Sequence, residues 1–292
     1  MDRQPQLVVV RPVQGQPGTP DGGLGRDSDS SLITGTGYLD DLEREARQWS
    51  LLVSGNRFST PVLRQALGFG GEVLESGSPR NDALTSPDRG KTAERVRRAL
   101  RLPEGKRVIL YAPTWREHLA RHRGGFAMDQ RIDLEHARRE LAEDQVLLVR
   151  GHSRVVEAVP GADDDFVRDV SAYPDATDLL LAADVLVTDY SSLMFDFAIT
   201  RKPMLFFGYD LERFREDSGG FYLDFERRAP GPLLRTSAEL VRALRDPDRA
   251  TAPYQDAYRW FRGTFCDLDD GRAAARAVDR MLELAAGDQL QP

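Results

Sequence analysis

The sequence predicts an α/β fold in which a parallel sheet is covered by helices on both faces, a doubly wound arrangement. Two observations carry this prediction. Short runs of apolar residues, such as 108–111 and 146–149, alternate with helical patterns along most of the chain. These runs show no alternation of apolar and polar residues, which is typical of strands that are buried on both faces.

Residues 1–85 are predicted to form a partial α/β portion. Residues 14–37 are rich in Gly, Ser, Asp and Pro, a composition that cannot pack a core and is typical of a flexible linker. Strand patterns occur at residues 7–10, 51–53 and 72–75, and helical patterns at 39–49 and 62–67. Because so few strands cannot complete a second sheet domain, we expect this portion to be the remnant of a domain whose beginning is absent.

Residues 86–292 contain enough patterns for one complete doubly wound domain that ends in helices. The predicted strands lie at 108–111, 146–149, 166–170, 185–187 and 204–207. The predicted helices lie at 92–100, 134–141, 176–183, 192–199, 238–244, 254–265 and 272–284. Helices are the usual connections between parallel strands, so the order of these patterns favours a parallel sheet.

Composition narrows the class of protein. The 292 residues correspond to about two ordinary domains of ~150 residues. Acidic residues outnumber basic ones by 47 to 40, which argues against a general nucleic-acid-binding protein. Cys266 is the only cysteine, so neither an intrachain disulfide nor a cysteine-based zinc site can form. No apolar run reaches the ~18 residues of a membrane span. We therefore expect a cytoplasmic protein, with peripheral contact at the inner face of the membrane left open.

We expect a ligand at the ends of the predicted strands, because open parallel sheets bind ligands at the carboxyl ends of their strands. The strongest candidate is the run DVLVTDYSSLMFDF at residues 184–197, in which Ser191 and Ser192 follow a strand. The free N–H groups and the dipole at the start of the next helix can hold a phosphate, and the hydroxyls add donors. The alternative is that either serine is an ordinary N-cap. Asp196, one turn further, could contact ligand hydroxyls or only cap and solvate the helix.

Two more predicted strands end in suitable side chains. Pro113 ends one strand, and Thr114 offers its backbone and hydroxyl donors to a ligand. Another strand delivers Arg150, Gly151 and His152 to the same edge. A lone histidine is more often structural than functional, but its position beside a cation at a strand end favours a functional role here.

Other patterns are weaker. Arg80, in the loop at 77–82, is well placed for a phosphate and equally well explained as a salt bridge in a turn. His118 and His122 have the spacing of a zinc-protease helix but lack its glutamate, so no metal site is predicted. Neither a G-x-G-x-x-G loop after a strand, nor a Walker-type loop, nor a nucleophile elbow is present. These absences disfavour NAD and ATP enzymes, and no cofactor is predicted.

Together these residues resemble the CDP-glycerol glycerophosphotransferase family, the teichoic-acid polymerases and primases of bacterial walls. The run TDYSS followed by FDF carries the most specific part of the resemblance, which covers most of residues 38–285. The matching segments are GSPRND (77–82), YAPTWRE (111–117), LLVRGH (147–152), DVLVTDYSSLMFDF (184–197), KPMLFF (202–207), GGFYLDF (219–225) and DDGRA (269–273).

The resemblance implies a GT-B-like, metal-independent enzyme with the ligand between two Rossmann-like halves. Residues 86–292 would be the complete Rossmann-like half, and 1–85 the partial one. His152 matches the second of two catalytic histidines in the family. The residues that match CDP-glycerol-binding positions are Gly18, Thr19, Arg80, Pro113, Thr114, Arg150, Gly151, Ser191, Ser192 and Asp196.

The sequence departs from the family at the first catalytic histidine, whose best counterpart is Pro17 in the run VQGQPGTP (13–20). Proline has no proton to exchange and cannot act as a general base. The leading hypothesis is transfer of glycerol phosphate from CDP-glycerol to a polymer or lipid-linked acceptor, with release of CMP. The alternatives are a non-catalytic nucleotide-binding paralogue or a fragment that needs a partner chain, and a GT-B sugar transferase with another nucleotide donor.

Overall fold

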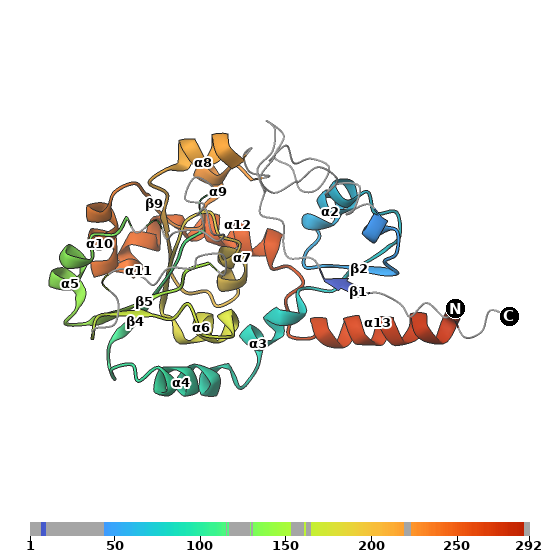
Figure 1. Ribbon diagram of the computed structural model, residues 1–292, viewed down its shortest axis with the longest axis horizontal. Coiled ribbons are helices and arrows are strands. Elements are labelled where there is room, and N and C mark those ends of the chain that lie inside the picture. The colour runs from blue at the N-terminus through green and yellow to red at the C-terminus, as the bar shows by residue number, and fades with distance from the viewer. Residues whose placement is uncertain are drawn as a thin grey trace, which may run out of the picture. The chain divides into compact units, whose positions relative to one another are not determined.

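The structure is a computed structural model that describes residues 7–9, 44–114, 116, 129, 131–152, 161, 165–218 and 223–288 (Figure 1). The chain forms two compact units. The first consists of Met1–Ser86, Glu212–Asp224 and Arg262–Pro292, and the second of Pro87–Leu211 and Phe225–Phe261. The domain boundary predicted after residue 85 places the final helices in the second domain. In the structure the final helix groups with the first unit, because it is hydrogen-bonded to the loop at 76–82.

The first unit contains a parallel sheet with the strand order β1-β2-β3. Its strands are β1 (Leu7–Val9), β2 (Leu51–Ser54) and β3 (Glu72–Glu75). Helix α2 (Ser59–Leu67) packs its apolar face on this sheet through Leu63 and Leu67, which contact Leu52 and Phe69. This unit also contains the 3-10 helix η2 (Pro79–Asn81), α3 (Asp82–Thr85) and α13 (Ala273–Asp288).

The second unit contains a sheet of six parallel strands in the order β6-β5-β4-β7-β8-β9. Numbered one to six from β4 to β9, this is the order 3-2-1-4-5-6 of the Rossmann fold. The strands are β4 (Arg107–Ala112), β5 (Gln145–Val149), β6 (Val167–Asp169), β7 (Val185–Thr188), β8 (Met204–Phe207) and β9 (Leu233–Leu234). The strand order reverses between β4 and β7, so a ligand site is expected where these two strands end.

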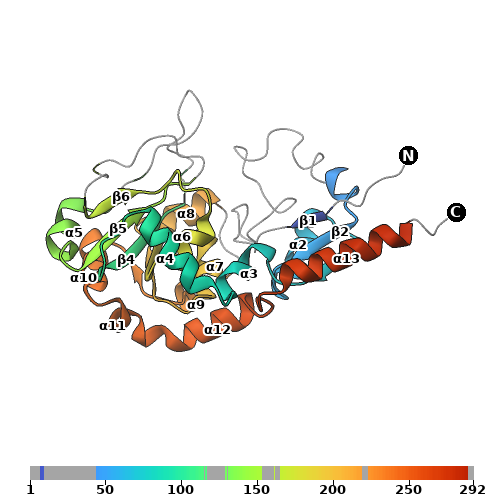
Figure 2. The ribbon, with the colours of Figure 1, turned by 90° about the horizontal axis from the view of Figure 1, so that it is seen from below.

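Helices cover both faces of this sheet. On one face, Ile109 packs in a core with Leu141 of α5 (Leu134–Leu141) and Leu240 of α10 (Ser237–Arg245). Successive strand residues point to opposite faces, so Leu110 and Leu186 face the other side, and both are fully buried. Helices α4 (Arg89–Ala99) and α6 (Ala176–Ala182) pack against each other, and α6 also contacts β4 (Figure 2).

The remaining helices connect these elements. They are α7 (Leu193–Ala198), α8 (Leu211–Ser218), α9 (Phe225–Arg228), α11 (Pro247–Thr251) and α12 (Gln255–Phe265). No helix in the described ranges is both long enough and apolar enough to span a bilayer. The predicted α/β class with a doubly wound parallel sheet is confirmed.

Sequence patterns missed the short elements. Strand β9 has only two residues, and its approach to β8 requires Gly231, where an added Cβ would lie 2.0 Å from the carbonyl oxygen of Met204. Helices α8, α9 and α11 are short and rich in charged residues, so they show too little apolar periodicity to be recognised. Of the helix predicted at 39–49, the described residues include a helical turn only at 44–46.

Candidate functional site

Three of the predicted segments leave neighbouring strands at one edge of the second sheet. In the parallel register, Tyr111 of β4 is the partner of Val149 of β5, and Ala112 is the partner of Thr188 of β7. The three segments that follow these strands therefore begin side by side at the carboxyl edge of the sheet; they are residues 113–114, 150–152 and 189–192. This edge includes the point where the strand order reverses, so the structure brings these candidate residues together as the sequence predicts.

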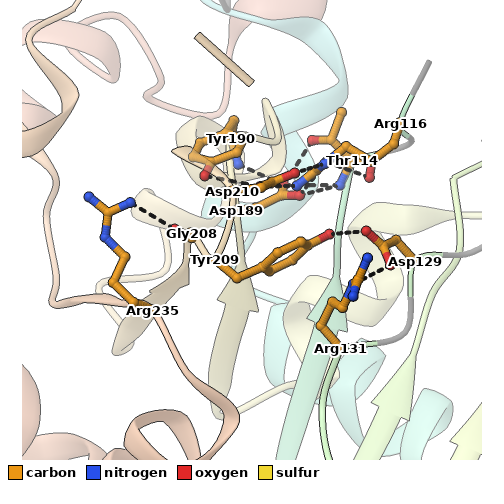
Figure 3. Close-up of polar contacts among 10 residues, drawn as sticks. All are labelled: Thr114, Arg116, Asp129, Arg131, Asp189, Tyr190, Gly208, Tyr209, Asp210 and Arg235. Carbon is orange, nitrogen blue, oxygen red and sulfur yellow. Dashed lines mark hydrogen bonds and ion pairs between the residues drawn. The ribbon is translucent and has the colours of Figure 1, made fainter. Parts of the chain in front are cut away.

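Asp189, at the end of β7, ties two of these segments together (Figure 3). Its side chain is 1% exposed. The carboxylate accepts hydrogen bonds from the Thr114 backbone N–H at 2.9 Å, from the Thr114 hydroxyl at 2.8 Å and from the Tyr190 N–H at 2.6 Å. The sequence predicts that both Thr114 donors face a ligand. In the structure both point to Asp189, so this hydroxyl keeps only its lone pairs, which accept hydrogen bonds.

Arg116 joins a third strand end to the first two. Its guanidinium lies 2.9 Å from the Asp189 carboxylate and donates to both oxygens of Asp210, from Nε at 2.6 Å and from Nη2 at 3.0 Å. It also donates to the carbonyl of Thr114 at 2.9 Å. Asp210 follows β8, so one buried cation connects the loops after β4, β7 and β8 (Figure 3). A planar guanidinium suits this two-point contact better than an ammonium group.

Electrostatics keep this group charged. Burial by itself lowers the pKa of Arg116, but the carboxylates of Asp189 and Asp210 outweigh burial and raise this pKa above its ordinary value. With two carboxylates around one guanidinium, the three side chains together carry one negative charge. This buried charge disfavours a phosphate directly at the Thr114 turn, and a diphosphate at this edge needs cations from other segments.

Tyrosine rings surround the buried cation. The Arg116 guanidinium lies 5.4 Å from the ring centre of Tyr190 and 5.5 Å from that of Tyr209, within the range of cation–π attraction. The Tyr190 hydroxyl donates to Asp210 at 3.3 Å, and the Tyr209 hydroxyl donates to Asp129 at 3.0 Å. Asp129 is also paired with Arg131 (Figure 3). The rings exclude water from the cluster and thereby strengthen its ion pairs.

The segment after β5 is held by the loop after β6. The Arg150 guanidinium donates to the backbone carbonyl of Tyr173 at 2.7 Å, and the Gly151 N–H donates to the Ser171 hydroxyl at 2.8 Å. Burial lowers the pKa of Arg150, while Asp175 acts in the opposite direction. These contacts fix the start of the segment that ends at the half-buried His152.

The serines precede a short helix. The Ser191 hydroxyl accepts a long hydrogen bond of 3.4 Å from the Leu193 N–H, and Ser192 stands at the N-cap of α7 without a side-chain capping bond. The N-cap alternative is therefore not supported for Ser192, whereas the Ser191 contact with the backbone two residues later is of the capping kind. Asp196 lies within α7 and is 7% exposed, so it does not act as a solvated surface residue.

The other candidates belong to the first unit or to residues that the structure does not describe. Arg80 is half-buried in η2 of the first unit. Gly18 and Thr19, together with Pro17, His118 and His122, lie outside the described residues. Among the residues that the structure does describe, no group of three or more His, Cys, Asp or Glu side chains could hold a metal ion.

Sequence reasoning missed the buried cluster itself. Asp189 and Arg116 lie inside the motifs TDYSS and YAPTWRE, and Asp210 follows KPMLFF, but the sequence patterns assign none of the three a role. A signal was available, because a charged residue directly after a buried apolar strand needs a partner of opposite charge. What the pattern could not supply was the identity of that partner.

Comparison with known proteins gives the family. The sequence model of the family described as CDP-Glycerol:Poly(glycerophosphate) glycerophosphotransferase matches residues 5–283. The chain is 39% identical over 265 residues to a teichoic acid glycerol-phosphate transferase of Staphylococcus aureus, covering 89% of this chain and 68% of the relative. It is 36% identical over 270 residues to a teichoic acid poly(glycerol phosphate) polymerase of Bacillus subtilis, covering 91% of this chain and only 36% of that relative.

The fold agrees with a solved structure. A variant of the wall teichoic acid polymerase TagF, soaked with CDPG, superposes with a TM-score of 0.82 at 34% identity, over 94% of this chain and 68% of that one. This likeness and the parallel sheets confirm the predicted GT-B-like α/β class. The resemblance deduced from the motifs is also confirmed: the chain belongs to the CDP-glycerol:poly(glycerophosphate) glycerophosphotransferase family.

Proposed function

We propose that this protein transfers glycerol phosphate from CDP-glycerol to a hydroxyl group of a teichoic-acid-like or capsular polymer and releases CMP. One observation carries the proposal: in a chain of this family, the segments 113–114, 150–152 and 189–192 leave three adjacent strands of one Rossmann-ordered sheet. The names of the relatives, a glycerol-phosphate transferase and a poly(glycerol phosphate) polymerase, support the same reaction.

The proposed chemistry is phosphoryl-group transfer. The acceptor hydroxyl oxygen forms a bond to the phosphorus next to glycerol, the bond from that phosphorus to the bridging oxygen breaks, and CMP leaves with the bonding electrons. The proton of the hydroxyl passes to a base or to water. Such reactions depend mainly on positioning and on stabilisation of charge.

The proposal assigns roles by position and charge. His152 contacts the reacting phosphoryl group, and Arg150, Ser191 and Ser192 contact the diphosphate. Arg80 is a further candidate for binding CDP-glycerol, because it matches a CDP-glycerol-binding position of the family. The buried cluster around Asp189 carries a net negative charge, so the Thr114 hydroxyl would accept a hydrogen bond from a ligand hydroxyl rather than bind a phosphate.

Replacement of His152 tests the assignment. We expect His152→Ala to reduce CMP release from CDP-glycerol, with a lipid-linked acceptor present, by at least the ~10²–10³-fold typical of losing one preorganised donor. His136→Ala is the matched control, because His136 is a half-buried histidine of the same unit on α5. Wild-type turnover by the His152 variant would refute the assignment.

The placement of Pro17 opposite a family histidine favours a second candidate, a paralogue that binds CDP-glycerol without turnover. Titration calorimetry combined with a CMP-release assay separates the two. Binding without CMP release supports the paralogue, whereas robust release excludes it. Contact with a membrane face and with a partner chain stays a prediction.

A further inference from the structure

The motif DDGRA (269–273) lies in the first unit, near the loop that carries Arg80, and the proposed function leaves it without a role. This motif is part of the 268–276 segment, which consists of the five residues before α13 and the first turn of that helix. Hydrogen bonds join this segment to the loop at 76–82, although about 190 residues separate the two in sequence. An interaction over so long a separation costs more chain entropy than a local one.

Three residues around Arg80 are anchored directly. The Asp269 carboxylate accepts hydrogen bonds from the Ser78 backbone N–H at 3.2 Å and from the Asn81 side-chain amide at 3.4 Å. The Asp82 carboxylate accepts from the backbone N–H groups of Ala273 at 2.9 Å and Ala274 at 2.8 Å, the first turn of α13. Ser78 and Asn81 are each 2% exposed. Arg80 therefore sits between two anchored and buried neighbours.

Arg276 holds the first residue of the loop at 76–82. Its guanidinium donates to the Ser76 carbonyl, from Nε at 3.1 Å and also from Nη2. The same guanidinium contacts both carboxylate oxygens of Asp270 at 2.8 Å and the carbonyl of Leu268 at 3.1 Å. The hydrogen bond from Arg276 lowers the pKa of Asp270 to about 2, so this pair stays ionised at neutral pH.

Two glycines allow the segments to approach this closely. Gly77 has a φ of +81°, and an added Cβ would lie 2.6 Å from the carbonyl oxygen of Leu268. Gly271 has a φ of +86°, and an added Cβ would lie 2.7 Å from the Thr85 hydroxyl. A side chain at either position meets both a strained backbone and a collision. The glycines on both sides of the contact thus serve one close packing arrangement.

We propose that the 268–276 segment positions Arg80 for the ligand, with Asp269 and Arg276 as positioning residues that act through the loop at 76–82. This inference rests on the proposed role of Arg80 in binding CDP-glycerol. The segment holds the backbone on both sides of Arg80, so the loop loses little backbone freedom when the ligand binds. Releasing the loop adds an ordering cost to binding, which weakens affinity.

A double-mutant cycle tests the inference. We expect Asp269→Ala to raise the dissociation constant for CDP-glycerol about tenfold, the effect typical of losing hydrogen bonds to a charged group. In the Arg80→Ala background the same change should add nothing, because Asp269 acts through Arg80. Equal weakening in both backgrounds would overturn the inference. Asp269→Asn keeps an acceptor oxygen and should restore most of the affinity.

The matched control is Arg280→Ala, one turn further along α13. Arg280 also pairs with a carboxylate, that of Glu72, and is exposed to nearly the same degree as Arg276, 33% against 35%, but its hydrogen bonds do not involve residues 76–82. We expect unchanged affinity for this control. Arg276→Lys is the second variant, because a lysine keeps a charge beside Asp270 and loses the two-point contact with Ser76.

Hydrogen exchange provides a readout that needs no ligand. We expect the amides of residues 76–82 to exchange faster in Asp269→Ala and Arg276→Lys than in Arg280→Ala. If the wild-type protein fails to bind CDP-glycerol, the proposed function fails, yet this exchange result still decides whether the segment holds the loop. Unchanged exchange in both variants would overturn the inference.

Discussion

At the scale of single residues, the buried guanidinium of Arg116 organises the candidate site. Its side chain is 4% exposed and lies between Asp189 and Asp210, which are 1% and 12% exposed. Removing a charge from water is costly, and the cost is offset only while both partners are present. The arrangement fixes the loops after β4, β7 and β8. Substitution of any one of the three side chains leaves a charge without its partner and is therefore destabilising.

Replacing this cation tests its structural importance. We expect Arg116→Met to lower the free energy of unfolding by about 3–5 kcal/mol, because two buried carboxylates lose their counter-charge. Urea denaturation measures the change. Arg95→Met removes the partly exposed pair with Asp178 on the same unit and should have a much smaller effect. Similar losses in both variants would contradict this account of Arg116.

Two buried tyrosines and the partly buried Tyr209 give a prediction for pH. Burial raises the pKa of Tyr111, Tyr190 and Tyr209 above the ordinary value of 10. Because the folded-state pKa is the higher one, these groups contribute stability that is complete below about pH 10 and lost as the pH rises further. Absorbance at alkaline pH should show these three ionising only together with unfolding. Ionisation of Tyr209 before unfolding, detected by comparison with Tyr209→Phe, would argue against this environment.

At the scale of elements, the sequence predicts the ends of some strands and helices much better than those of others. The apolar runs locate β4, β5, β7 and β8 to within one residue at each end, because burial on both faces demands continuous apolar sequence. The short elements β9 and α9 depend on their neighbours and show no such run. Helix α10 is intermediate, because a capping box at Thr236 and Glu239 defines its start.

The start of α10 is testable by one substitution. The Thr236 hydroxyl accepts from the Glu239 N–H at 3.2 Å, and the Glu239 carboxylate accepts from the Thr236 N–H at 3.1 Å. We expect Thr236→Ala to lower the free energy of unfolding by ~1 kcal/mol. Thr92→Ala, inside α4, is the control and should change stability by less than about 0.5 kcal/mol. Thermal or urea unfolding of both variants decides the point.

At the scale of the whole molecule, the first unit is assembled from three separate parts of the chain. Its last part includes α13, whose Arg280 pairs with Glu72 of β3 and whose Arg276 reaches Ser76. The amino-terminal strands therefore depend on residues at the far end of the sequence. The second unit has its own six-stranded sheet and does not include α13.

Truncation tests this dependence. We expect a chain ending at residue 270, which lacks α13, to lose hydrogen-exchange protection at Leu52 and Val53 of β2 while keeping it at Ile109 and Leu110 of β4. A chain ending at residue 284 keeps Arg276 and Arg280 and serves as the control. Equal loss of protection in the two sheets would show that the units do not respond separately.

The sequence by itself determined the α/β class, the main strands, the residues at the strand ends and the family, because each of these leaves a local pattern or a motif. Only the tertiary structure decided the partners: Thr114 with Asp189, 75 residues apart, Arg116 with Asp210, 94 apart, and Ser78 with Asp269, 191 apart. Apolar periodicity reports which residues are buried, whereas the partner of a buried charge depends on strand order and loop path. Those features arise from packing over the whole chain, so no local stretch of sequence encodes them.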